Sequence, residues 1–118
     1  MGIPSKLAQA ALCLSLATLV VACDQFDRVV VRNSESEPLI VAWQLPGGGE
    51  RERSPLSPVT TRNVGYIGGP PDPPQDIIVK AFDTTGALVY CRRFSPSEYQ
   101  KTSTENPVVL KPGDLRCS

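Results

Sequence analysis

The side chains best suited to chemistry in this sequence are its cysteines, because the chain contains no histidine. Without histidine, neither a Ser-His-Asp nor a Cys-His nucleophilic arrangement can form, and the usual histidine-based zinc sites are excluded as well. Cys91 and Cys117 lie 26 positions apart and no CxxC motif is present. The sequence therefore contains neither a thiol-redox motif nor a four-cysteine zinc site. We expect no metal and no cofactor.

Carboxylates and lysines are the other groups that could act on a substrate. Two pairs of glutamates have i, i+2 spacing, which places both members of a pair on one face of a strand: Glu35 with Glu37, and Glu50 with Glu52. Both pairs fall in segments expected to be loops, where solvated charge is far more common than an acid–base pair or a calcium site. Three lysines could serve in a Ser-Lys dyad, although no motif frames one: Lys80, Lys101 and Lys111.

Three further motifs favour structural interpretations. Residues 69–74 satisfy the PxxP spacing twice, but such a segment is more often a stiff loop than a polyproline recognition motif. Residues 47–49 are three glycines without the Lys-Ser/Thr that a phosphate-binding loop requires. Arg92 and Arg93 adjoin on opposite faces of an expected strand, so at most one points into solvent, where it could contact anionic headgroups.

Composition narrows the class of protein. The chain has 118 residues, enough for one domain, and its formal net charge is zero. No basic patch interleaved with aromatic residues is present, so nucleic acid is not an expected partner. Twelve prolines and nine glycines favour short strands separated by turns over long helices.

The N-terminal segment has three parts. Residues 1–6 carry one positive side chain, residues 7–22 are apolar and uncharged, and Cys23 is followed at once by Asp24. A helix that spans a bilayer needs about 20 mostly apolar residues, and this stretch is shorter and contains polar side chains. A signal h-region followed by a small-residue cleavage site fits better.

Val20-Val21-Ala22-Cys23 resembles the lipobox of bacterial lipoproteins. The resemblance implies that residues 1–22 are a cleaved signal peptide and that Cys23 becomes the lipidated first residue of the mature chain. A thiolate is a good nucleophile for taking up a diacylglyceryl group, and Ala22 is small enough to enter the peptidase. The family favours Leu at the first lipobox position and a small residue at the second, so Val20 and Val21 depart from its pattern. An ordinary secretory signal cut near Ala22 and an uncleaved anchor are the alternatives.

Lipidation of Cys23 would leave an even number of cysteines. Cys13 departs with the h-region, so only Cys91 and Cys117 remain, in an oxidising compartment. Their disulfide would close a loop of about 26 residues and contribute about 3–4 kcal/mol on the chain-entropy estimate. It would also tie the C-terminal tail back to the domain. The alternative is a buried thiol at Cys91 and a loose one at Cys117.

The mature chain divides into a short tether and a run of predicted strands. Residues 23–27, the lipidated N-terminus and tether, span at most roughly 17 Å, which holds a domain over residues 28–118 close to the lipid. β-branched and apolar runs predict strands over residues 28–32, 39–45, 59–67, 77–83, 87–94 and 107–110. The first two are expected to form one hairpin and the fourth and fifth another. Residues 50–58 are expected to be a loop and residues 111–118 a tail.

A capping box adds a short helix to this pattern. Ser95-Pro96-Ser97-Glu98 places serine at the N-cap and proline at the first helical position, which predicts one or two turns ending by Lys101. The strands predict an all-β fold: a small antiparallel β-sandwich, Ig-like or transthyretin-like, with one short helical turn. The aromatic residues expected to anchor its core are Trp43, Phe82, Tyr90 and Phe94.

Turn motifs carry a second resemblance. The asparagine after the first strand, the Asp-Thr-Thr-Gly at residues 83–86 and the Phe-Ser-Pro-Ser-Glu-Tyr at residues 94–99 resemble small bacterial secreted β-sandwich proteins of uncharacterised function, over residues 28–110. That resemblance implies a fold and no chemistry.

These features predict a membrane-anchored, extracytoplasmic lipoprotein of the bacterial cell envelope that acts as a non-catalytic binding or structural module. The expected partners are membrane lipid, through Cys23, and an envelope protein. The competing hypothesis is a small extracytoplasmic hydrolase that uses carboxylates or a Ser-Lys pair.

Overall fold

The computed structural model describes residues 26–67 and 73–117. Residues 1–22 and Cys23 lie outside this part of the chain, as do residues 68–72 of the proline-rich segment. The elements, in chain order, are β1 (Phe26–Asn33), β2 (Leu39–Gln44), β3 (Arg51–Leu56), β4 (Thr60–Ile67), β5 (Ile77–Phe82), β6 (Leu88–Phe94), α3 (Pro96–Tyr99), β7 (Val108–Val109) and β8 (Leu115–Arg116).

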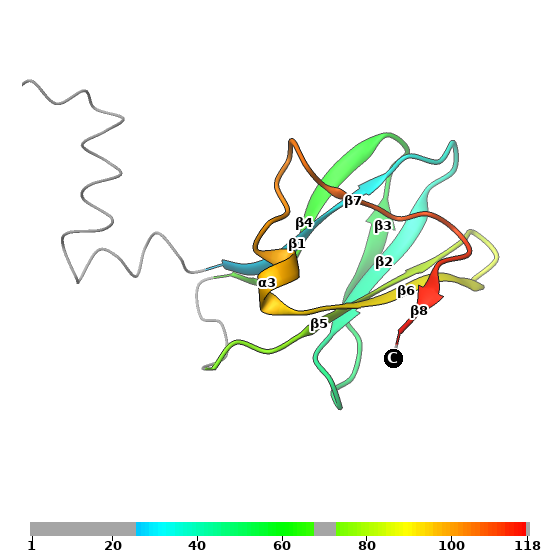
Figure 1. Cartoon of the computed structure of the whole chain (residues 1–118). Helices are drawn as coiled ribbons and strands as arrows, with labels where there is room; N and C mark the ends of the chain where they lie inside the picture. Colours follow the sequence, from blue (N-terminus) through cyan, green and yellow to red (C-terminus); the bar gives the residue numbers. More distant parts are fainter. Residues whose placement is uncertain (1–25, 68–72, 118) are drawn as a thin grey trace, which may run out of the picture.

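Two packed sheets make up the domain (Figure 1). One sheet has three strands in the order β4-β1-β7, and the other has five in the order β3-β2-β5-β6-β8. The β1–β4 pair and the run β3-β2-β5-β6 have the neighbour relations of strands B–E and C′-C-F-G in immunoglobulin-like sandwiches. The prediction of an all-β sandwich is therefore confirmed.

The three-stranded sheet is built on the β-branched run of β1. Val29 and Val31 point into the core, while Val30 on the opposite face is also buried, because the chain after α3 covers it. The backbone nitrogen of Val30 donates to Oγ1 of Thr102 over 3.0 Å. β1 pairs with β4 along its whole length, from Phe26 opposite Ile67 to Asn33 opposite Thr60.

The five-stranded sheet supplies the other half of the core. Its central strands β2, β5 and β6 pair antiparallel, and alternate residues face the first sheet. The inward side chains include Val41, Val79, Tyr90 and Phe94, all of which are buried. The outer face of the same sheet also carries buried apolar residues, among them Ala42, Ile78 and Phe82, and the guanidinium of Arg53 covers Phe82 at 3.9 Å from the ring centroid. This double covering explains why β2 and β5 are almost continuously apolar.

Three expectations about the strands were wrong. The first two predicted strands do not form a hairpin, because β1 and β2 belong to different sheets and residues 34–38 cross between them. Residues 51–56, predicted as loop, form β3; its proline, Pro55, is tolerated because β3 is an edge strand of its sheet. The sandwich is not wholly antiparallel either, since β7 runs parallel to β1 and β8 parallel to β6.

The element boundaries also differ in places. β1 begins at Phe26, two residues before the predicted start of the domain at Arg28. Residues 115–116 of the predicted tail form β8. The β5–β6 hairpin is confirmed, and so is α3, which begins with the predicted capping box and ends at Tyr99, within the predicted limit of Lys101.

Candidate functional site

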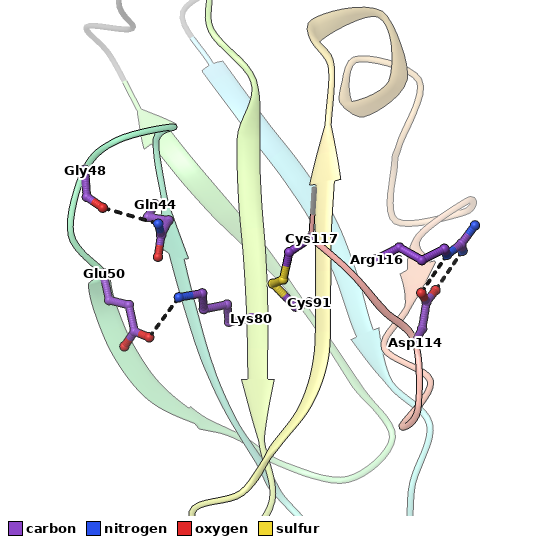
Figure 2. The surroundings of a disulfide bond; sticks show 8 residues. All are labelled: Gln44, Gly48, Glu50, Lys80, Cys91, Asp114, Arg116 and Cys117. Atoms are coloured by element: carbon purple, nitrogen blue, oxygen red, sulfur yellow. Dashed lines mark hydrogen bonds and ion pairs between the residues drawn. A yellow bond between two sulfur atoms is a disulfide. The ribbon is translucent and has the colours of Figure 1, made fainter.

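The cysteine pair lies on the outer face of the five-stranded sheet. Cys91 on β6 is fully buried and is joined by a disulfide to Cys117, with 5.0 Å between their Cα atoms. Figure 2 shows the bond holding the C-terminal chain against β6. The backbone nitrogen of Cys91 donates to the carbonyl of Asp114 over 2.8 Å. The disulfide thus secures the edge strand β8, as the sequence predicted for this pair.

Of the glutamates and lysines of the hydrolase hypothesis, Lys80 and Glu50 form an ion pair. Nζ of Lys80, directly opposite Cys91 in the sheet register, is 3.5 Å from the carboxylate of Glu50 (Figure 2). Glu50 also pairs with Arg53 at 3.2 Å. Glu52 lies on β3 rather than in a loop, so the expectation that both members of this pair are in a loop was wrong. Glu50 and Glu52 have different partners, because Glu50 pairs with Lys80 and Arg53 whereas Glu52 accepts a hydrogen bond from Trp43.

Arg92 and Arg93 lie on opposite faces of β6, as the strand prediction required. Arg92 is opposite Val79 on the inward side and lies 3.9 Å from the carboxylate of Glu98. Arg93 is opposite Ile78 on the outer side and pairs with Asp76 at 2.7 Å. Each guanidinium therefore has a carboxylate partner, which leaves less charge available for an anionic headgroup.

A separate hollow of about 280 Å³ opens where β3 meets β4, between the two sheets. We call it the aromatic hollow; it is lined by Trp43, Arg51, Glu52, Gly65 and Tyr66. The rings of Trp43 and Tyr66 meet edge to face with centroids 5.1 Å apart. This contact brings β2 of one sheet against β4 of the other.

Arg51 covers both rings of the aromatic hollow. Its guanidinium carbon is 5.3 Å from the ring centroid of Trp43 and 5.3 Å from that of Tyr66. One guanidinium nitrogen donates to the hydroxyl of Tyr66 over 3.0 Å. Cation–π attraction and this hydrogen bond together fix the orientation of an exposed arginine side chain.

Glu52 occupies an unusual backbone position. It has φ +53°, in the left-handed region that a residue with a side chain rarely adopts, and it lies beside a bulge in the pairing of β2 with β3. The bulge directs its carboxylate to the indole, where Oε1 accepts from Nε1 of Trp43 over 2.7 Å. Strained backbone of this kind costs about 1–3 kcal/mol and is concentrated at binding sites.

Gly65 allows β4, which lines the hollow, to approach its partner strand β1. It has φ +134°, and a Cβ added there would lie 2.4 Å from the backbone oxygen of Asp27. Only glycine fits this position without moving β1.

A second hollow, of about 350 Å³, lies beside the β5–β6 turn and the crossing from β1 to β2. Its acidic lining includes Glu35, Glu37 and Asp83. The carboxylate of Asp83 accepts from the backbone nitrogens of Thr85 and Ala87 and from the hydroxyl of Thr85. These hydrogen bonds, that of the Thr85 hydroxyl first, hold the pKa of Asp83 below its ordinary value. Asp83 is thus engaged in forming the turn.

Sequence reasoning identified Trp43 as a core anchor but missed its neighbours. Trp43, Tyr90 and Phe94 are buried in the core cluster, whereas Phe82 is buried on the outer face. Arg51 and Glu52 were assigned to a loop, because a charged run with a following proline has no strand signal. Their two opposite charges, next to each other and shortly after the only tryptophan, were the one available hint.

Comparison with protein-family models, with curated proteins and with solved structures gives no match for this chain. Across residues 26–67 and 73–117, the structure contains no helix long and apolar enough to cross a bilayer.

Proposed function

We propose that this protein is a lipoprotein of the bacterial cell envelope, anchored through Cys23, whose β-sandwich is a non-catalytic binding module held at the membrane surface. The observation that carries the proposal is the start of β1. Phe26 is already paired with Ile67, so only three positions separate the folded domain from Cys23. Fully extended, that stretch covers about 11 Å.

This short connection has a mechanical consequence. A diacylglyceryl group brings two acyl chains, which anchor a protein stably where one chain would not. The end of the sandwich formed by the start of β1 and the end of β4 then faces the lipid. The aromatic hollow lies at this end, because Tyr66 is opposite Asp27 in the β1–β4 register. A binding function next to the bilayer is therefore the role we assign to the domain.

The anchor is tested with two cysteine variants of the full chain. Cys23→Ala removes the residue that would take up lipid, while the matched control Cys13→Ala changes a cysteine that would leave with the signal peptide. We expect the Cys23 variant to lose the lipid-modified form by mass spectrometry and to leave the washed membrane fraction. The control should remain there like the parent. Equal, firm membrane association of the Cys23 variant and the parent would refute the anchor.

A further inference from the structure

We propose that the aromatic hollow binds the phosphoethanolamine headgroup of a membrane lipid, with Arg51 on the phosphate and Glu52 on the ammonium. The inference deepens the proposed function and rests on it, because the anchor is what brings the hollow to the lipid. Three properties of the hollow support it: separated opposite charges, their fixed orientation, and their place in the fold.

The two charges are adjacent in sequence yet do not neutralise each other. Within the described residues no ion pair joins Arg51 to Glu52, although both side chains are exposed. Each is held by an aromatic residue instead, Arg51 by the hydroxyl of Tyr66 and Glu52 by the indole of Trp43. A cation and an anion kept apart in one hollow complement a ligand that carries both charges.

Arg51 has the chemistry of a phosphate ligand. A guanidinium has five N–H donors in a planar fork, so the one bond to Tyr66 leaves donors for two phosphate oxygens. Contact with the two rings and the hydrogen bond to Tyr66 restrict the guanidinium before the ligand arrives. This reduces the side-chain entropy lost on binding.

Glu52 accounts for the choice of ammonium. Its carboxylate has about four lone-pair sites and the indole uses one of them, on Oε1. A primary ammonium can donate to the remaining sites, whereas a trimethylated choline has no N–H to donate. The volume of about 280 Å³ suits a headgroup rather than a larger ligand.

The place of the hollow favours a lipid over a dissolved ligand. Tyr66 lies opposite Asp27, and Asp27 is four positions after Cys23. At most about 14 Å of chain therefore separates the proposed lipid attachment from this part of the ladder. A headgroup at the bilayer surface is within reach of a domain tethered so closely.

Trp43 provides a direct readout, because it is the only tryptophan in the chain. The purified full chain, in micelles of an uncharged detergent, is titrated with phosphatidylethanolamine while the indole fluorescence is recorded. We expect a saturable change. Phosphatidylglycerol, which lacks the ammonium, and phosphatidylcholine, which lacks its N–H groups, should bind at least about tenfold more weakly, since hydrogen bonds to charged groups are worth about that factor or more.

Two variants assign the roles, and a third serves as control. Arg51→Gln should weaken phosphatidylethanolamine binding at least about tenfold, and Glu52→Gln should abolish the preference over phosphatidylcholine. Arg53→Gln removes an arginine of the same strand that covers Phe82 on the outer face, and it should leave the titration unchanged. Thermal unfolding of each variant verifies that the domain remains folded.

Several results would overturn the assignment. Equal responses to the three lipids, or an equal loss of binding in the Arg51 and Arg53 variants, would show that the hollow does not bind the headgroup specifically. Binding of free glycerophosphoethanolamine as tightly as the lipid would replace the lipid with a soluble ligand. The titration does not depend on Cys23. Failure of the anchor would therefore appear in the membrane fractionation, and failure of headgroup binding would appear in the fluorescence titration.

Discussion

The side-chain nitrogen of Asn33, at the end of β1, donates to the backbone oxygen of Leu56 on β3 over 3.0 Å and so links the two sheets. The same nitrogen donates to the carbonyl of Glu37 over 2.9 Å, and Oδ1 accepts from the backbone nitrogen of Glu35 over 2.9 Å. Asn33 is fully buried. One amide therefore fixes both the crossing from β1 to β2 and the position of β3.

Asn33→Ala should destabilise the domain strongly. The substitution leaves the buried carbonyl of Leu56 and the part-buried carbonyl of Glu37 and N–H of Glu35 without their partner. A buried loss of this kind costs about 1–3 kcal/mol. We expect the free energy of unfolding to fall by about 3 kcal/mol or more, measured by chemical denaturation. Asn63→Ala, which changes an exposed residue of β4, is the matched control and should change it by less than about 0.5 kcal/mol. Similar losses for the two variants would contradict the bridging role.

Gly65→Ala should disturb both the fold and the aromatic hollow. The added Cβ would lie 2.4 Å from the backbone oxygen of Asp27, at a φ of +134° that alanine rarely adopts. We expect a loss of at least about 2 kcal/mol in unfolding free energy and a shift in Trp43 fluorescence. Gly49→Ala, where a Cβ would meet nothing within 4 Å, should do neither. A Gly65 variant with the stability and fluorescence of the parent would show that β1 can move away from the added Cβ without a loss of unfolding free energy.

Tyr90 should make the domain labile to alkali. Burial raises the pKa of its phenol to about 12, from an ordinary 10.0. As pH rises, the unfolded chain therefore loses this proton before the folded chain does. The contribution of this group to stability is fully present below pH 10 and declines as pH rises from 10 towards 12. Stability measured over this range should fall less steeply in Tyr90→Phe than in the parent.

Near neutral pH the same variant should behave differently from a second tyrosine variant. The hydroxyl of Tyr90 has no hydrogen-bond partner among the described residues, so Tyr90→Phe should be neutral or stabilising. Tyr99→Phe should instead cost about 1 kcal/mol, because the hydroxyl of Tyr99 donates to the carbonyl of Gln75 over 3.1 Å. A large loss in the Tyr90 variant would contradict an unpaired hydroxyl at this position.

The disulfide should account for a sizeable part of the stability. Cys117→Ser opens a cross-link over 26 positions, and the expected loss in unfolding free energy is about 3–4 kcal/mol. The amide of Cys91, bonded to the carbonyl of Asp114, should also exchange hydrogen faster once β8 is released. A reductant should lower the parent to the level of the variant and leave the variant itself unchanged. If it destabilised both equally, its effect would not come from this bond.

Local patterns predicted most elements because local forces form them. The valines of β1, the apolar runs of β2 and β5 and the capping box of α3 need only nearby residues to indicate strand or helix. β3 was missed since Arg51–Leu56 is charged and contains a proline, and it is a strand only because β2 provides a partner. β8 was missed for a similar reason, as two residues pair with β6 where the disulfide holds them.

The sequence by itself determined the all-β class and the exclusion of histidine-dependent chemistry, because composition and short-range periodicity suffice for these. It left the pairing of Cys91 with Cys117 open, since a disulfide depends on how near the two residues lie in the fold. Only the tertiary structure decided that β1 and β2 enter different sheets, and that Arg51 and Glu52 meet Trp43 and Tyr66 in one hollow. The physical reason is that these contacts depend on how two sheets pack across the core. That packing is set by side chains distant in sequence, such as Asn33 and Leu56, and no local pattern records it.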